Sequence, residues 1–149
     1  MRAVVQRVKD AVVSVDGRSV GSIRSGLLVY LGIGRKDSEK DLRTITEKVA
    51  NLRIFPDQTG KMNLSLPDVQ GEIMVISQFT LFGDAREGRR PSYTEAAPPE
   101  QARTLYQKAI EMLGAMGFHV AAGQFQASME VAYTNVGPVT ILLDTEKRF

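Results

Sequence analysis

The apolar run at residues 27–33 (Leu-Leu-Val-Tyr-Leu-Gly-Ile) constrains the fold more than any other stretch of the chain. It follows a predicted turn at Ser25-Gly26, and it shows no polar alternation. A strand of this kind must be covered on both faces, because it has no side for water. A second apolar run lies at residues 73–76, within a strand predicted over residues 72–79. The sequence therefore predicts a central sheet with both faces buried.

Two helices are predicted around the second apolar run. The first begins at Ser38, which forms a capping-box pattern with Asp41, and its apolar side chains recur at helical spacing: Leu42, Ile45, Val49 and Leu52. The second begins near Pro98-Pro99-Glu100, where proline is tolerated in the first turn, and ends at Gly117. Its buried stripe is expected to contain Leu105, Ala109, Met112 or Leu113, and Met116.

Both ends of the chain are predicted to form strands. Near the start every second residue is apolar at Ala11, Val13 and Val15, and Asp16-Gly17 is typical of a two-residue hairpin turn. Near the end, two or three strands are expected, at about residues 118–122, 129–133 and 139–143. The order is strands, helix, strand, helix, strands, without the glycine fingerprint of a dinucleotide-binding fold. This indicates one mixed α/β domain over residues 1–149, because a chain of this length can fold around one hydrophobic core.

The composition excludes several kinds of chemistry and of location. No cysteine is present, so thiolate catalysis and disulfides are impossible. The single histidine, His119, is expected at an exposed strand edge, so neither a serine–histidine triad nor a zinc site is expected. Glu72 and Asp144 lie at strand ends, where solvation is the default, so carboxylate acid–base catalysis is not expected. We expect no metal, no cofactor, no signal peptide, no membrane span and a cytoplasmic location.

Two short polar segments interrupt predicted strands. Ser77-Gln78-Phe79-Thr80 closes the second apolar run, and Asn-Val-Gly-Pro-Val-Thr at residues 135–140 separates two strand-like stretches. A buried polar atom without a hydrogen-bond partner costs about 1–3 kcal/mol, so polar groups in such positions are expected to have a partner. A Gly-Pro pair allows close approach to the backbone and fixes one φ angle. The two segments are predicted to be halves of one site.

Hydroxyl groups and the backbone are the remaining candidates for chemistry. Thr80 is the obvious nucleophile, but neither it nor Ser77 has an adjacent base in the sequence. A hydroxyl at a strand end also commonly bonds to the local backbone. We therefore expect Ser77 and Thr80 to position a reacting group. The backbone N–H groups of Phe79 and Thr80 are the expected donors to an oxyanion, with the Gln78 side chain nearby.

Several motifs occur together in an order and spacing that one enzyme family shares. They are Val5-Gln6-Arg7-Val8, Gly26-Leu27-Leu28-Val29, Arg53-Ile54-Phe55, Gly60-Lys61-Met62-Asn63, Ser77-Gln78-Phe79-Thr80-Leu81, Arg90-Pro91-Ser92-Tyr93, Gly123-Gln124-Phe125 with Met129, and Gly137-Pro138-Val139-Thr140. Through them the chain resembles the D-aminoacyl-tRNA deacylases, which hydrolyse the ester that joins a D-amino acid to its tRNA. The resemblance implies a layered α/β fold with a barrel-like sheet flanked by helices, paired into a homodimer.

The resemblance also implies how such an enzyme selects its substrate. A cis Gly137-Pro138 peptide from one subunit would enter the active site of its partner and exclude an L side chain. Glycine has no side chain, so glycyl-tRNA is expected as a second substrate. The 2′-hydroxyl of the terminal ribose is expected to assist hydrolysis of an ester that is already labile. Family members commonly carry an acidic residue where this chain has Val136, so a charged role at that position is not expected.

Two further groups have a functional and a structural interpretation. Phe125 and Met129 resemble the family's pocket for the terminal adenine, and their alternative is ordinary core packing. Arg86, Arg89 and Arg90 could contact tRNA phosphates, or could form a solvated loop. A net charge of +2 and a pI near 9.0 are compatible with both interpretations.

Three functions remain open from the sequence. The resemblance favours the deacylase. A non-catalytic module that binds the tRNA end is the first alternative. The second is an oligomeric scaffold in which Gln78 and the Gly-Pro pair serve only assembly.

Overall fold

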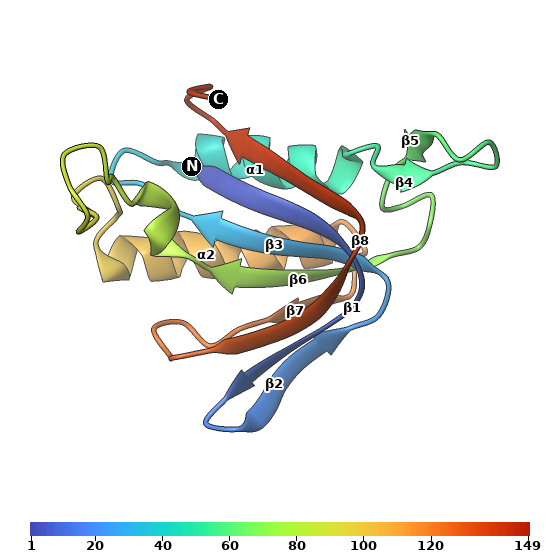
Figure 1. Cartoon of the computed structure of the whole chain (residues 1–149), viewed down its shortest axis with the longest axis horizontal. Helices are drawn as coiled ribbons and strands as arrows, with labels where there is room; N and C mark the ends of the chain where they lie inside the picture. Colours follow the sequence, from blue (N-terminus) through green and yellow to red (C-terminus); the bar gives the residue numbers. More distant parts are fainter.

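The computed structural model describes all 149 residues (Figure 1). Its elements are β1 (Arg2–Val15), β2 (Arg18–Ile23), β3 (Gly26–Gly32), α1 (Glu39–Asn51), β4 (Phe55–Pro56), β5 (Met62–Leu64), β6 (Glu72–Ser77), the 3₁₀ turn η1 (Phe79–Phe82), α2 (Pro99–Ala115), β7 (Val120–Ala122) and β8 (Glu130–Asp144). The main sheet has the strand order β2-β1-β3-β6-β7, and β8 pairs with β1. Parallel pairing of β3 with β6, and of β6 with β7, places these three strands in one direction.

The sheet curls because β1 takes part in both of its halves. The first half of β1 pairs with β3 and the second half with β2, through a hairpin at Asp16-Gly17. Both turn residues have positive φ, at 50° and 73°, as the favoured two-residue hairpin turn requires. At the other end β2 approaches β7, since a Cβ on Gly21 would lie 3.0 Å from the Ala122 carbonyl oxygen. The sheet is therefore a nearly closed barrel (Figure 1), and the predicted α/β class with a barrel-like sheet is confirmed.

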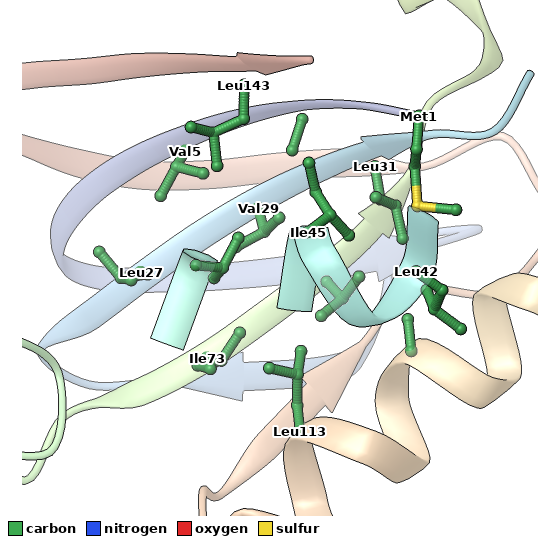
Figure 2. Packing of buried hydrophobic residues seen from close by; sticks show 14 of the residues in the cluster. Met1, Val5, Leu27, Val29, Leu31, Leu42, Ile45, Ile73, Leu113 and Leu143 are labelled. Carbon is green, nitrogen blue, oxygen red and sulfur yellow. The ribbon is translucent and has the colours of Figure 1, made fainter. Parts of the chain in front are cut away.

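The side chains of β3 alternate between two cores. Leu27, Val29 and Leu31 pack with the buried stripes of α1 and α2, as Figure 2 shows, whereas Leu28 packs with Met74 in a second cluster. Full burial of such a side chain contributes about 1.5–3 kcal/mol. The prediction that residues 27–33 are covered on both faces is confirmed.

The helices begin where the sequence predicts and differ from it at their ends. The Ser38 N–H donates to Asp41 Oδ2 at 2.9 Å, which caps α1. Leu52 lies one residue beyond the end of α1. Met116 is 42% exposed rather than buried, because α2 ends at Ala115 and Met116 has left the helical stripe. No helix of the chain has the length and apolar character that crossing a membrane requires.

One predicted strand boundary is wrong, and the structure decides that two strands, rather than three, close the chain. β6 ends at Ser77, and Phe79 lies in η1, because Gln78 turns the backbone at φ −142° and ψ 81°. Residues 129–133 and 139–143 do not form separate strands, since both stretches pair with β1 within the single strand β8. Residues 136–139 bulge from β8 opposite the single residue Arg7.

Candidate active site

The turn η1 packs against the end of β3. The Gln78 N–H donates to the Leu31 carbonyl at 2.9 Å and so continues the pairing of β3 with β6. Gly32 allows the close approach, because a Cβ there would lie 3.0 Å from both the Gln78 carbonyl oxygen and the Leu81 Cβ. Contacts this short would push the turn away. The glycine therefore helps to define where η1 lies.

The first amides of η1 are not used by the turn itself. The turn is closed by the N–H of Leu81, which donates to Gln78 at 3.3 Å, and that of Gly83, which donates to Thr80 at 2.9 Å. The N–H groups that open a helical turn have no partner inside it. Those groups belong here to Phe79 and Thr80, and both residues are exposed. This end of the turn can therefore donate two hydrogen bonds to a ligand.

The two polar side chains of the segment bond to each other. Gln78 Nε2 donates to Thr80 Oγ1, so the Thr80 hydroxyl keeps its own proton to donate elsewhere. Neither Thr80 nor Ser77 has a hydrogen bond to a histidine or a carboxylate. The structure thus contains no adjacent base that could activate either hydroxyl as a nucleophile.

A cavity of about 830 Å³ opens beside η1. Its lining joins Ser77, Gln78 and Phe79 to Phe125 and Met129, which lie in the segment between β7 and β8. Most of the lining is hydrophobic, and the size suits a small-molecule site. Residues of two predicted groups that are distant in sequence therefore meet in one cavity, although Thr80 itself does not line it.

Phe125 is held by two neighbours that the sequence analysis missed. The ring centroids of Phe125 and Tyr106 are 5.9 Å apart, and the Arg103 guanidinium carbon lies 5.0 Å from the Phe125 centroid. The Tyr106 hydroxyl donates to the Val75 carbonyl at 2.8 Å, and burial raises the pKa of Tyr106 to about 12. The alternative of core packing for Phe125 is thus only half correct, since its ring contacts a buried tyrosine and also lines the cavity. The available signal was that Tyr106 directly follows Leu105, the first residue of the predicted buried stripe.

The Gly137-Pro138 peptide bond is cis, as the resemblance implies. Gly137 has φ +124°, a conformation that side chains rarely adopt. A Cβ on Gly137 would also lie 2.7 Å from Val139 Cγ2 and 2.9 Å from Arg7 Nη2. Glycine is therefore required at this position by both conformation and space.

The bulge of β8 is braced by side chains at its base. Arg7 Nε donates to the Val136 carbonyl at 3.1 Å, and Arg7 Nη1 donates to the Ile54 carbonyl at 2.6 Å. Asn135 Oδ1 accepts from the Val139 N–H at 3.0 Å across the bulge. Arg7 belongs to the motif Val5-Gln6-Arg7-Val8, but this bracing role was not predicted. A charged residue among the apolar residues of the first strand was the signal.

Within one chain the two polar segments do not meet. Arg7, opposite the bulge, pairs with Leu27 at the start of β3, whereas Gln78 bonds to Leu31 near its end. Four residues of strand, at about 3.3 Å each, separate these levels by roughly 13 Å. In Figure 1, β8 bends at one end of the sheet and the arrowheads of β3 and β6 point to the other. Gly137 and Pro138 accordingly do not line the cavity, so the segments can share a site only between two copies.

Comparison with known proteins tests the resemblance directly. A family model described as D-Tyr-tRNA(Tyr) deacylase matches residues 4–144. The chain belongs to this family. Curated relatives named D-aminoacyl-tRNA deacylase include those of Thermotoga petrophila, 54% identical, and Fervidobacterium nodosum, 57% identical. Both matches extend over 149 residues and cover 100% of this chain and of the relative, so the predicted family is confirmed.

Two solved structures show how closely this deacylase-family chain keeps the family's fold. The structure titled c-Myc DNA Unwinding Element Binding Protein is 40% identical, with a TM-score of 0.91 over 97% of this chain and 99% of that one. A probable eukaryotic D-amino acid tRNA deacylase is 17% identical, with a TM-score of 0.83 over 95% of this chain and 97% of that one. The second likeness shows the fold alone. The barrel-like architecture therefore persists where most of the sequence has changed.

The loop that carries Arg86, Arg89 and Arg90 does not contribute to the lining of the cavity. Arg86 forms two bonds to the Asp84 carboxylate, at 2.9 and 2.5 Å, which lower the pKa of Asp84 to about 2. Arg89 and Arg90 are exposed and have no ion pair. Of the three predicted phosphate contacts, Arg86 thus already has a carboxylate partner, and the other two do not.

The histidine and the two strand-end carboxylates also lie away from the cavity. His119 is exposed. Glu72 accepts hydrogen bonds from the backbone and side chain of Arg24, which lower the pKa of Glu72. Asp144 is not solvated as expected: its side chain is 1% exposed and faces Arg2. None of the three lines the cavity.

Proposed function

We propose that this protein hydrolyses the ester of D-aminoacyl-tRNA and releases free tRNA and the D-amino acid. The main support for this proposal is the cavity in which Ser77, Gln78 and Phe79 meet Phe125 and Met129. The chain is also more than half identical to proteins named D-aminoacyl-tRNA deacylase. Such a reaction removes mischarged tRNA before translation, which makes it a proofreading step. Because tRNA is charged in the cytoplasm, we place the protein there.

Catalysis would depend on the backbone of η1. The ester carbonyl lies at the start of the turn, where the N–H groups of Phe79 and Thr80 stabilise the oxyanion. One such preorganised donor contributes about 10²–10³ in rate. The bond from Gln78 to Thr80 holds both side chains at the reacting group. The substrate's free 2′-hydroxyl takes part in proton transfer, which fits a site without a histidine or carboxylate base.

The RNA end would be bound by stacking and by charge. Phe125 and Met129 form the apolar place for the terminal adenine, and stacking of a base on an aromatic ring is worth about 1–3 kcal/mol. Arg89 and Arg90 contact phosphates of the acceptor end, because neither charge is compensated by a carboxylate. Arg86 contributes less, since Asp84 already pairs with it.

The protein would act as a homodimer with shared active sites. Gly137 and Pro138 are exposed and lie at the far end of the sheet from their own cavity, which supports insertion into a partner's cavity. The strand β8 also exposes apolar side chains that a partner could cover, namely Tyr133, Val136 and Leu142. The inserted carbonyls would bind the substrate ammonium and exclude an L side chain. Glycyl-tRNA lacks that side chain and would be hydrolysed as well.

Hydrolysis of matched D- and L-tyrosyl-tRNA by the purified protein tests the proposal. We expect release of D-tyrosine and of glycine from glycyl-tRNA, and little release of L-tyrosine. Binding of D-tyrosyl-tRNA without release would instead indicate the non-catalytic module. A Gln78→Met variant that remains dimeric but loses hydrolysis would exclude a purely assembling role for Gln78.

A further inference from the structure

Arg2 joins the start of β1 to the turn η1. Its Nη1 donates to the Leu81 carbonyl at 2.8 Å, and its guanidinium carbon lies 4.6 Å from the centroid of the Phe82 ring. The Arg2 side chain is 19% exposed, and Phe82 is buried at 9%. Leu81 and Phe82 are the last residues of the turn that begins with Phe79 and Thr80. A charged side chain thus binds the closed end of the turn whose open end faces the ligand.

The ion pair of Arg2 does not account for this contact. Asp144 Oδ2 lies 3.7 Å from Arg2 Nε, beyond hydrogen-bond distance, and neither atom has another hydrogen-bond partner. Asp144 compensates the charge but does not orient the guanidinium. The Leu81 carbonyl is the acceptor that Arg2 binds at hydrogen-bond distance.

We infer that Arg2 is a positioning residue for the ester hydrolysis proposed above, on which this inference rests. The last carbonyls of a short turn have no partner within it, and a charged donor satisfies them more strongly than a neutral one. Bound at Leu81 and Phe82, the turn presents the amides of Phe79 and Thr80 at a defined place. Arg2 itself does not line the cavity, so it acts through the turn.

Two substitutions separate the hydrogen bond from the bulk of the side chain. Arg2→Met keeps the length and loses the donor, whereas Arg2→Lys keeps one charged donor. Displacement of a reacting geometry by about 1 Å can lower the rate ~100-fold, so we expect kcat of Arg2→Met to fall about 10–100-fold. KM should change by less than about twofold, because the substrate-contacting groups remain. Arg2→Lys should retain an intermediate kcat, and a lysine variant as slow as the methionine variant would overturn the assignment.

A matched control variant tests whether general destabilisation, and not the loss of the Arg2 contact, lowers kcat. Val49→Ala deletes buried side-chain atoms in α1, away from η1, and should lower the unfolding midpoint without changing kcat of the folded enzyme. The variants are compared at a temperature where all of them are folded. An equal loss of kcat in Val49→Ala would overturn the positioning role.

Amide hydrogen exchange tests the same inference without any measurement of activity. In Arg2→Met, the amides of Leu81 and Gly83, which close η1, should exchange faster than in the wild type. The amides of β3 should exchange as before. Unchanged exchange in the turn would overturn the inference. Should the wild type fail to release D-tyrosine, the proposed function fails, while the exchange still decides whether Arg2 orders the turn.

Discussion

At the scale of the residue, contacts made by a few side chains determine where the candidate functional atoms lie. Gln78 donates to Thr80, Arg7 braces the bulge at Val136, and Tyr106 supports the ring of Phe125. Each of these bonds ends on a neutral acceptor or an apolar surface. Such contacts orient groups without changing their charge.

Thr80 allows a direct test of covalent against positional catalysis. Thr80→Val keeps the shape and removes the hydroxyl, so we expect kcat for D-tyrosyl-tRNA to fall about tenfold, since the backbone donors remain. Thr80→Ser, which retains the hydroxyl, should lose less. Removal of a covalent nucleophile lowers kcat by about 10⁶-fold, as in a serine protease. A loss of that size in Thr80→Val, with an acyl-enzyme trapped on the wild type, would contradict the positional role.

Tyr106 links stability to alkaline pH. Its pKa is raised from the ordinary value of 10.0 to about 12 by burial, so its stabilising contribution is complete below pH 10 and is lost as the pH rises towards 12. Tyr106→Phe should lose roughly 0.5–1.5 kcal/mol at pH 8 with the bond to Val75, and should then lose less between pH 10 and 12. Urea unfolding at pH 8, 10 and 11.5 measures both effects. Because burial also raises the pKa of Tyr30 to about 12, some alkaline loss will remain in the variant.

At the scale of the element, β3 organises the molecule. Its start pairs with β1 beside the bulge, its end binds η1, and its side chains enter both cores. The strand can do this because glycine stands wherever another backbone comes close. At Gly26, an added Cβ would overlap the carbonyl group of Glu72 in β6.

Two glycine-to-alanine changes should therefore have opposite effects. Gly26→Ala forces β3 and β6 apart and should destabilise the protein by about 2–4 kcal/mol. Gly114→Ala lies within α2, where nothing comes within 4 Å of the added Cβ, and should stabilise it by about 0.5–1 kcal/mol. Urea unfolding of both variants gives the comparison. Equal effects of the two changes would contradict the close approach of β3 to β6.

At the scale of the whole molecule, the proposed site would be shared between two chains. The cavity and the Gly137-Pro138 bulge lie at opposite ends of one sheet, and the bulge is exposed. A two-fold dimer can bring the bulge of each copy to the cavity of the other, since its interface uses the same surfaces on both subunits. Such a dimer would have two equivalent sites, each with contributions from both subunits.

Mixing two impaired variants tests this arrangement. Gly137→Ala disrupts the bulge and Gln78→Met disrupts the cavity, so each homodimer should have little activity. If the bulge acts in the partner's cavity, refolding the two together should restore about a quarter of wild-type activity, because half of the dimers are mixed and each has one intact site. Refolding each variant alone is the control. No recovery in mixed dimers would contradict a shared site.

Sequence patterns that span only a few residues predicted much of the secondary structure of this protein. The apolar run at residues 27–33, the helix starts at Ser38 and Pro99, and the Asp16-Gly17 turn can each be recognised from a few consecutive residues. The motifs along the chain, taken together in their order and spacing, were enough to predict the family. The predicted strand end at Phe79 was wrong because Gln78 turns the backbone there, and the number of C-terminal strands depended on pairing with the distant strand β1.

From its sequence, the chain could thus be assigned its two helices, its buried central strands, its family and the residues around which the candidate site forms. Only the tertiary structure decided that Phe125 meets Gln78 in one cavity, that Arg2 reaches the carbonyl of Leu81, and that the Gly-Pro bulge lies at the far end of the sheet. The physical reason is the register of β1 against β3 and β8. Periodicity and turn chemistry act over a few residues, whereas register depends on all the contacts between strands that are distant in sequence.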